Sequence, residues 1–367
     1  MALLEIASLA KSFHREPVLA DVSLRANAGE IIAIFGPSGT GKTVLLRLIA
    51  GLEEQTSGEI TIDGRDMEGV PPEQRGVGMA FQNFALFPHM TAFENIASPL
   101  RASRANGAVA SGVGRVAKLL KIDHVLSHAP RELSNGQKQR TSLARALAAS
   151  PKILLLDDPL RNVDAKLRFE MRLELPRLLR QSGAAVLYVT QDYKEAMALA
   201  DRIAVMLGGI FEQVATPEEI YESPTSLAVA RLFGDPAINI IEGAVSDTGA
   251  DGASLTLADA TLPLDPAYRI HTGRSVTIGI RPEALAILDG RDPKGDLTVM
   301  VQAVTPLNER TVLLLAAESG WEFLASLPSS GEAIPEAGNR VSVQIRPAGL
   351  HLFDRETGRR LAAGQQG

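Results

Sequence analysis

Apolar runs without polar interruptions recur along the first two-thirds of the chain. The segments 31–35, 153–156 and 186–189 each consist of consecutive apolar residues. Such runs are typical of strands buried on both faces, as in a parallel sheet covered by helices. Between about 87 and 149 the apolar spacing is instead helical, and small residues are frequent. The pattern therefore predicts an α/β domain over residues 1–235, with a helical insert at about 87–149.

The pattern changes at Gly234, Asp235 and Pro236. Beyond residue 238 the apolar segments are short and alternate with turns that contain Gly, Pro and Asp. Short strands with regular turn signals predict a small β-rich barrel or sandwich over residues 236–367. The clearest strand candidates in this part are 275–280, 297–304, 311–315 and 341–345.

A short echo lies within this β-rich part. The segment 280–285 reads Ile-Arg-Pro-Glu-Ala-Leu, and the segment 345–350 reads Ile-Arg-Pro-Ala-Gly-Leu. Two explanations are open, a duplicated half-barrel or a chance match.

The composition is that of an ordinary globular protein. Of 367 residues, 45% are hydrophobic and 22% are charged, which argues against intrinsic disorder. The formal charge of −6 lacks the basic character of a general nucleic-acid binder, and the absence of cysteine excludes disulfides and thiolate sites. The apolar runs reach about six residues, far fewer than the roughly 18 of a membrane span. Because the N-terminus has Glu5 and no basic region, it does not resemble a signal peptide, and we expect a soluble cytosolic protein.

A candidate phosphate-binding loop lies between the apolar run 31–35 and a predicted helix at 44–50. Glycines allow backbone N–H groups to approach phosphate oxygens, and the helix N-terminus adds partial positive charge. Lys42 supplies a full charge, and the Thr43 hydroxyl is a ligand for Mg²⁺. A glycine-rich turn with an unrelated lysine is the alternative, which the flanking strand and helix disfavour. The predicted nucleotide-binding residues of this loop are Gly36, Pro37, Ser38, Gly39, Thr40, Gly41, Lys42 and Thr43.

A carboxylate follows the second apolar run, because the segment 153–156 leads into Asp157. In P-loop nucleotide hydrolases, an Asp that is associated with Mg²⁺ occupies this position. Many buried strands end in Asp, so the signal is weak alone and strong only beside the loop at 36–43.

A helix cap precedes this carboxylate along the chain. Ser134 and Gln137 match the capping box of a helix predicted over 138–149. The N-terminus of such a helix attracts anions. An ordinary capped helix without a ligand is the alternative interpretation.

The order of these motifs resembles that of the ATP-binding-cassette (ABC) ATPases. The segment 279–283 and the segment 351–354 are similar to hallmarks of the regulatory extension in carbohydrate-importer ATPases of the maltose or glycerol type. The resemblance covers nearly the whole chain. It implies an α/β P-loop ABC ATPase domain with a helical insert, followed by a small β-rich OB-like (TOBE) domain. The residues similar to the signature motif of the family are Leu133, Ser134, Asn135, Gly136 and Gln137.

The resemblance also implies roles for single residues. Phe13 would stack on adenine, with a core phenylalanine as the alternative. Gln82 would sense Mg²⁺ and the attacking water, with a surface glutamine as the alternative. The signature segment 133–137 would face the γ-phosphate held by another subunit, and Asp164 would belong to the loop that links the two sites. The implied cofactors are ATP and Mg²⁺, with Thr43, Gln82 and Asp157 around the metal.

Four positions depart from the family pattern. Asp158 replaces the Glu that polarises the attacking water, and its carboxylate is retracted by up to about 1.5 Å. A misplacement of about 1 Å costs on the order of 10²-fold in rate. Gln191 replaces the His that contacts the γ-phosphate, and an amide can donate a hydrogen bond but carries no charge. Asn135 replaces a Gly of the signature, and Arg161 replaces a small Ser.

We therefore predict an importer subunit that binds ATP well and hydrolyses it slowly at its own P-loop, with Asp158, Gln191 and Gln82 as the hydrolytic residues. The predicted partners are a second ATPase subunit, two membrane permease subunits and, indirectly, an extracellular solute-binding protein. An unlike ATPase partner is favoured and a homodimer is the alternative. A groove beside the helical insert would receive a permease helix. The subunit would lie at the cytoplasmic face of the inner membrane and serve a sugar, polyol or similar small solute.

Two other functional classes stay open. A regulatory subunit that holds nucleotide with little hydrolysis is compatible with Asp158 and Gln191. A soluble ABC ATPase acting on nucleic acid is the second class. The segment 241–367 has 16 acidic and 11 basic residues and four aromatic residues, so it lacks a basic groove with stacking platforms. We therefore expect no nucleic-acid partner.

Overall fold

The computed structural model divides into two compact units, Met1–Pro217 and Glu218–Gly367. The sequence pattern predicted a boundary near 235, so the segment 218–235 belongs to the second unit instead of the first. Residues 1 and 367, which limit the two predicted domains, lie outside the described part of the chain. The structure describes residues 2–102, 109–161, 163–248, 252–289, 295–329 and 334–363.

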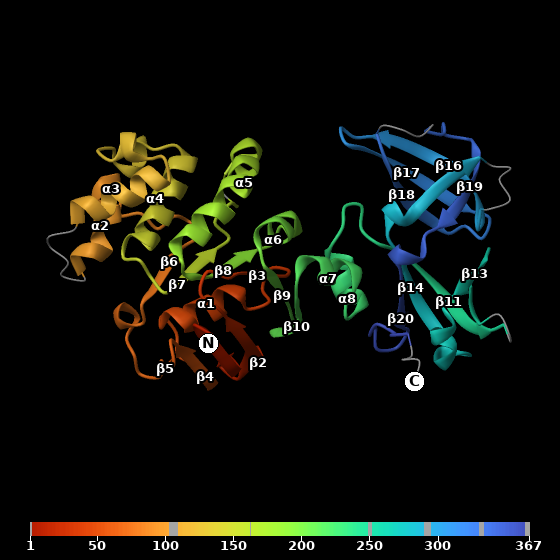
Figure 1. The fold of residues 1–367 in the computed structure, drawn as a ribbon, viewed down its shortest axis with the longest axis horizontal. Helices are drawn as coiled ribbons and strands as arrows, with labels where there is room; N and C mark the ends of the chain where they lie inside the picture. The colour runs from red at the N-terminus through yellow and green to blue at the C-terminus, as the bar shows by residue number, and fades with distance from the viewer. Residues whose placement is uncertain are drawn as a thin grey trace. The chain divides into compact units, whose positions relative to one another are not determined.

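A six-stranded sheet forms the centre of the first unit, in the order β10-β9-β3-β8-β7-β6 (Figure 1). Every neighbouring pair is parallel except β9 and β10. The predicted strands at 31–35, 153–156 and 186–189 are confirmed as β3, β7 and β8. The strand bounds are β3 (Ile31–Phe35), β6 (Val77–Ala80), β7 (Ile153–Asp157), β8 (Ala185–Thr190), β9 (Arg202–Leu207) and β10 (Ile210–Ala215).

Two hydrophobic cores lie on opposite faces of this sheet. In β7, Ile153 and Leu155 join one core, and Leu154 and Leu156 join the other. Both faces are therefore buried, which explains why these strands show no alternation of apolar and polar residues. The other elements of this part are α1 (Lys42–Ala50), α5 (Ala165–Ser182), α6 (Tyr193–Leu199) and the antiparallel strands β1 (Leu4–Phe13), β2 (Glu16–Ala26), β4 (Ser57–Ile62) and β5 (Arg65–Asp66).

Three helices occupy the stretch predicted to be a helical insert, and Figure 1 shows them as a group beside the sheet. They are α2 (Ala92–Ala102), α3 (Val109–Leu119) and α4 (Asn135–Ala148). Their apolar faces share a core that includes Ile96, Val113 and Leu143. None of the helices in the described part of the chain has both the length and the apolar character needed to cross a bilayer.

The second unit is rich in β-structure, as predicted. Its two five-stranded antiparallel sheets have the orders β13-β12-β11-β14-β20 and β15-β19-β16-β17-β18, and they share one core. The strands are β11 (Asn239–Asp247), β12 (Ala253–Thr256), β13 (Thr261–Leu264), β14 (Ser275–Ile280), β15 (Leu285–Asp289), β16 (Leu297–Pro306), β17 (Arg310–Ala317), β18 (Glu322–Pro328), β19 (Arg340–Ile345) and β20 (Leu350–Asp354).

The sequence echo corresponds to two related crossings between these sheets. Strand β14 passes through a short 3₁₀ turn into β15, and β19 passes through a similar turn into β20. The two turns are hydrogen-bonded to each other, since Arg281 N–H donates to Gly349 O at 2.9 Å and Arg346 N–H donates to Ala284 O at 2.9 Å. The repeat therefore builds matching halves of one structure, which favours duplication over a chance match.

A buried arginine explains why the segment 218–235 belongs to the second unit. This segment contains α8 (Leu227–Leu232) and most of α7 (Pro217–Glu222). The Arg281 guanidinium donates to the carbonyls of Ala230, Phe233 and Tyr221, and it lies 3.9 Å from the centre of the Tyr221 ring. These contacts tie both short helices to the end of β14. The boundary predicted near 235 came from the positions of Gly and Pro, which carry no information about such long-range contacts.

Candidate functional site

A cavity of about 290 Å³ opens at the carboxyl ends of β3, β7 and β8. In a parallel sheet these ends meet at one edge, which is where ligands of α/β proteins bind. The cavity brings together all of the predicted hydrolytic and metal-binding residues with part of the phosphate-binding loop, since Gly36, Pro37 and Thr40 do not line it. Its lining residues are Val18, Ser38, Gly39, Gly41, Lys42, Thr43, Val44, Gln82, Asp157, Asp158, Arg161, Val189 and Gln191.

The phosphate-binding loop has the backbone geometry that its glycines permit. Gly41 precedes α1 with φ at 98°, and a Cβ there would meet Leu19 Cδ2 at 2.6 Å. A Cβ at Gly36 would meet Met206 O at 2.2 Å. Both positions therefore require glycine, and the loop can hold its N–H groups close to a phosphate.

Lys42 is buried, and its ammonium group lies inside the loop. It donates to Gly36 O at 2.8 Å and to Pro37 O at 2.5 Å. Burial lowers the pKa of Lys42, and the nearby carboxylates of Asp158 and Asp157 oppose this shift. The loop carbonyls thus hold the Lys42 ammonium at the position where it would pair with a bound phosphate.

Thr43 and Asp157 form an oxygen pair suited to a hard cation. The Thr43 hydroxyl donates to Asp157 Oδ1 at 3.1 Å, and Gln82 lines the same cavity. Burial raises the pKa of Asp157, and the Thr43 hydrogen bond opposes this shift. A hydroxyl, a carboxylate and an amide are the oxygen ligands that Mg²⁺ accepts beside phosphates, so these residues fit the predicted metal.

Asp158 follows β7 in a left-handed backbone conformation, with φ at 46°. Its carboxylate is largely buried, and Oδ2 lies 3.6 Å from Arg161 Nη1. Burial raises the pKa of Asp158, while the Arg161 charge opposes this shift and the Asp157 charge adds to it. Arg161, identified in the sequence only as a departure from the family, therefore shares the cavity with the candidate general base.

Gln191 follows β8 and faces the phosphate-binding loop across the cavity. Its Oε1 accepts a hydrogen bond from the Ser38 hydroxyl at 2.9 Å. The turn that holds it is buttressed by Glu195, which is buried and accepts from Tyr188 Oη at 3.0 Å and Thr190 Oγ1 at 2.9 Å. This support was not predicted, although the sequence has Glu195 four residues beyond Gln191.

The loop that carries Gln82 is fastened to the signature helix α4. Phe84 and Ala85 both have positive φ, and their carbonyls face α4. Ser142 Oγ donates to Phe84 O at 2.9 Å, and Arg145 donates to Ala85 O at 2.7 Å. The loop that follows Gln82 is therefore connected to the helical insert by hydrogen bonds from α4.

An apolar groove of about 880 Å³ lies beside this loop. Its walls include β6, α2 and α4, and the side chains that line it include Met79, Phe81, Phe87 and Pro99. Phe87 is partly exposed, and the Arg145 guanidinium lies 5.5 Å from its ring centre.

The signature segment forms the predicted capping box at the start of α4. Ser134 N–H donates to Gln137 Oε1 at 2.9 Å, and Gln137 N–H donates to Ser134 Oγ at 3.3 Å. Asn135 lies in the first turn with ordinary helical geometry, so it does not need the unusual backbone angles that asparagine tolerates. Leu133 is buried and Ser134 is exposed, and no signature residue lines this chain's own cavity.

Phe13 and Asp164 also lie outside the cavity lining. Phe13 ends β1 with 38% of its surface exposed, and Lys11 Nζ lies 4.6 Å from its ring centre. The alternative of a core phenylalanine is therefore wrong. Asp164 is exposed and its carbonyl accepts from Arg168 N–H at 2.9 Å, at the start of α5.

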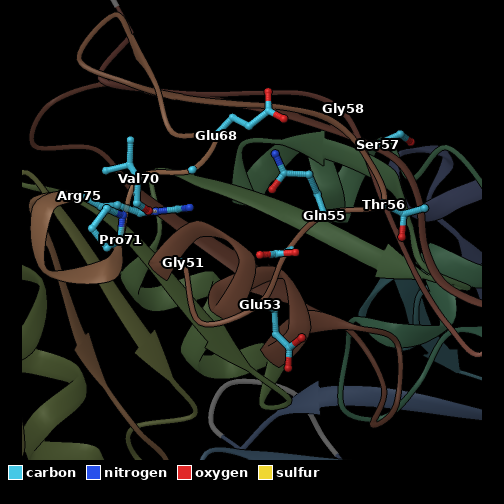
Figure 2. A pocket seen from close by; sticks show the side chains of 12 residues that line it. Gly51, Glu53, Gln55, Thr56, Ser57, Gly58, Glu68, Val70, Pro71 and Arg75 are labelled. Atoms are coloured by element: carbon cyan, nitrogen blue, oxygen red, sulfur yellow. Dashed lines mark hydrogen bonds between the residues drawn. The ribbon is translucent and has the colours of Figure 1, made fainter.

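A second pocket in the same unit, of about 520 Å³, has more carboxylates than cations among its lining residues, many of which Figure 2 labels. Its lining includes Glu53, Glu54 and Glu68. Its cation, Arg75, is buried and donates to carbonyls of the fold, among them Leu48 O at 2.9 Å at the end of α1. Three carboxylates with an internally satisfied arginine do not suit a polyanion, so the cavity at Lys42 is the better nucleotide site.

Comparisons with known proteins found similarity along nearly the whole chain. A family model described as ABC transporter matches residues 19–161, one described as MalK OB fold domain matches 234–285, and one described as TOBE domain matches 278–353. The sn-glycerol-3-phosphate import ATP-binding protein UgpC of Yersinia pseudotuberculosis is 41% identical over 372 residues, covering 98% of this chain and 99% of that protein. The protein of the same name from Escherichia coli O6:H1 is 40% identical, covering 98% of this chain and 100% of its own length.

Proposed function

Since the chain belongs to the ATP-binding subunits of ABC importers, whose ATPase activity is coupled to import through a separate permease, we propose that it serves a small polyol or polyol phosphate. The observation that carries the proposal is the full-length similarity to relatives named for sn-glycerol-3-phosphate import, across both units. The cassette does not contact the solute in such a system, so this similarity supports the solute class only through the transport system as a whole.

We propose that ATP binds at the 290 Å³ cavity with its phosphates on the loop at 36–43. Lys42 then neutralises phosphate charge, and Thr43, Gln82 and Asp157 hold Mg²⁺, which screens the phosphates when bound. The support is the buried ammonium and the Thr43–Asp157 contact of 3.1 Å. Asp158 is the residue suited to accept the proton of the attacking water.

We propose that two copies of this chain enclose ATP between them. The N-terminus of α4 supports this, because Ser134 and Asn135 are exposed and the first turn has no acidic residue that would repel a phosphate. The unlike ATPase partner that Asp158 and Gln191 suggested has no support in the comparisons, so the homodimer replaces it. Both sites then depend on this chain's own hydrolytic residues.

We propose that the groove beside Gln82 receives an amphipathic helix of a permease subunit. A groove lined by Phe81, Phe87 and Pro99 suits the apolar face of a helix. Its connection to α4 through Arg145 and Ser142 would transmit movements between the nucleotide and the permease. The subunit would thereby be held peripherally at the cytoplasmic face of the membrane, with a solute-binding protein acting on the other side.

The proposed solute class is testable by uptake in cells that lack this chain. We expect loss of uptake of sn-glycerol-3-phosphate or a related polyol, rescue by the wild-type chain, and no rescue by Lys42→Ala. Unchanged uptake of polyols and polyol phosphates, with loss of maltose uptake, would instead assign the chain to a sugar system.

The proposed groove is testable separately. Phe87→Glu is expected to release the chain from permease-containing membranes while leaving ATP binding intact, because it introduces a charge into an apolar groove. Phe169→Glu is the matched control, since Phe169 is an exposed phenylalanine of α5 that does not line the groove. Equal membrane association of both variants would contradict this docking site.

A regulatory subunit with little hydrolysis is the second candidate function. The observation in its favour is the pair Asp158 and Gln191, which we expect to weaken hydrolysis while the binding residues are intact. ATP turnover of the chain assembled with its permease distinguishes the two functions, because only the energising subunit hydrolyses ATP in step with solute uptake.

A further inference from the structure

The charged side chains that line the cavity are balanced, with two cations and two anions. Lys42 and Arg161 are the cations among its lining residues, Asp157 and Asp158 are the anions, and Gln191 is neutral. In the proposed homodimer, which this inference presupposes, no unlike subunit restores a charge at position 191. A further cation of this chain beside the γ-phosphate would offset the charge that the neutral Gln191 leaves uncompensated.

Arg161 has the geometry to be that cation. Its side chain is 52% exposed and lines the cavity, and its Nη1 lies 3.6 Å from Asp158 Oδ2, whose side chain is only 11% exposed. In the described part of the chain, this ion pair is the one interaction of the guanidinium. A guanidinium has five N–H donors, so most of its hydrogen-bonding capacity is left for a ligand.

A bound phosphate can replace Asp158 as the partner of the Arg161 guanidinium. The Arg161 guanidinium is half-exposed and lies 3.6 Å from Asp158 Oδ2, longer than a hydrogen bond, so a phosphate can compete with the carboxylate for its N–H groups. Phosphate oxygens accept two parallel hydrogen bonds from a guanidinium and carry more charge than one carboxylate. The same movement would free the Asp158 carboxylate to act on water.

We infer that Arg161 is a further catalytic residue, whose guanidinium contacts the γ-phosphate of bound ATP and supplies the positive charge that Gln191 lacks. The water oxygen forms a bond to the γ-phosphorus while the bond to the β–γ bridging oxygen breaks. ADP leaves with the electron pair of that bond, and the water proton passes to Asp158 and then to inorganic phosphate. Arg161 stabilises the charge on the γ-phosphoryl oxygens throughout.

The decisive experiment compares nucleotides with and without a γ-phosphate. For Arg161→Ser, we expect binding of the non-hydrolysable analogue AMP-PNP to weaken about tenfold and binding of ADP to change less than about twofold, since only the former reaches Arg161. ATP turnover is expected to fall about 10- to 1,000-fold. Isothermal titration with Mg²⁺ present and a phosphate-release assay provide the measurements.

Arg180→Ser is the matched control. Arg180 is 53% exposed and pairs with Asp201 at 2.9 Å, but it does not line the cavity. It has the same residue type, exposure and kind of partner as Arg161, so its substitution should change neither AMP-PNP binding nor turnover. A loss of the same size in Arg180→Ser would mean that both substitutions act through the fold, which would overturn the inference.

A second test asks whether Arg161 and position 191 supply the same charge. In the Gln191→His background, Arg161→Ser is expected to reduce turnover less than about threefold, because the histidine restores a cationic donor. Arg161→Lys should retain part of the activity. A full-sized loss in the histidine background would contradict a shared role.

The outcomes separate this inference from the proposed function. Suppose that Arg161→Ser binds both AMP-PNP and ADP with the affinity of the wild type, and that its turnover is unchanged or increased. Arg161 would then only restrain Asp158, and the inference would fail. A wild-type chain that binds neither nucleotide would refute the proposed function itself.

Discussion

In the loop half of the cavity, Lys42 is buried and held by carbonyls of its own loop, whereas in the other half Arg161 is half-exposed and held by one long ion pair. Among the described residues, the side chain of Gln191 is likewise held by one hydrogen bond, which the Ser38 hydroxyl donates. The protein therefore holds Lys42 of the loop half by more and shorter contacts than it holds Arg161 of the hydrolytic half.

This difference means that binding and hydrolysis are separable in this chain. The groups proposed to bind ATP are backbone N–H groups and a buried ammonium, which the strand–loop–helix geometry holds in place. The residues proposed for hydrolysis are Asp158, Gln191 and Arg161, which come from two other strand ends. Substitutions in one half should therefore change affinity, and substitutions in the other half should change turnover.

The largest expected effect belongs to the loop half. Lys42→Ala removes the buried ammonium, and we expect ATP affinity to fall at least about 100-fold with loss of measurable turnover, because a charged group bound to phosphate is lost. Titration with ATP and ADP measures it. Lys121→Ala, at an exposed lysine that pairs with Glu174, is the control and should bind normally.

The double variant Asp158→Glu with Gln191→His probes the hydrolytic half. We expect turnover to rise about 10- to 100-fold, because the longer carboxylate reaches the water and the imidazole adds a charged donor. ATP affinity should stay within about threefold of wild type. Each single variant serves as a control and should gain less. No increase in phosphate release would show that Asp158 and Gln191 are not what limits hydrolysis.

Ser38→Ala tests the contact between the two halves. The Ser38 hydroxyl orients the Gln191 amide, so its loss should lower turnover about fivefold, the equivalent of one hydrogen bond, and leave ATP affinity nearly unchanged. Ser57→Ala, at an exposed serine of β4, is the control for steady-state assays. A fall in affinity without a fall in turnover would assign Ser38 to the binding half alone.

Glu195→Gln is expected to have the smallest effect, and on stability. Burial raises the pKa of Glu195 above its usual 4.5, so its ionised form destabilises the folded state at pH 7. The neutral amide would remove this cost and raise Tm by about 2 °C. The difference should vanish below about pH 4.5, where wild-type Glu195 is protonated in both the folded and the unfolded states.

Thermal unfolding at pH 7 and pH 4 measures this effect. Glu170→Gln is the matched control, because Glu170 is exposed on α5 and should show no such pH-dependent gain. A lower Tm for the Glu195 variant at pH 7 would mean that the ionised carboxylate stabilises the turn beneath Gln191.

The sequence alone determined the local elements of this protein. The strand at 31–35, the glycine loop that follows and the capping box of Ser134 and Gln137 each arise from neighbouring residues, so spacing and residue type suffice to predict them. The β-rich character of the C-terminal part was equally readable, because short strands and turns are local patterns.

Only the tertiary structure decided which distant residues meet. Thr43 contacts Asp157 across 114 positions, and Ser38 contacts Gln191 across 153. The pairing of Arg161 with Asp158 and the unit boundary held by Arg281 likewise depend on side-chain positions in the folded chain. Periodicity records which face of an element is buried, but not which strand end or carbonyl lies opposite a given side chain, because that is set by how the elements pack together.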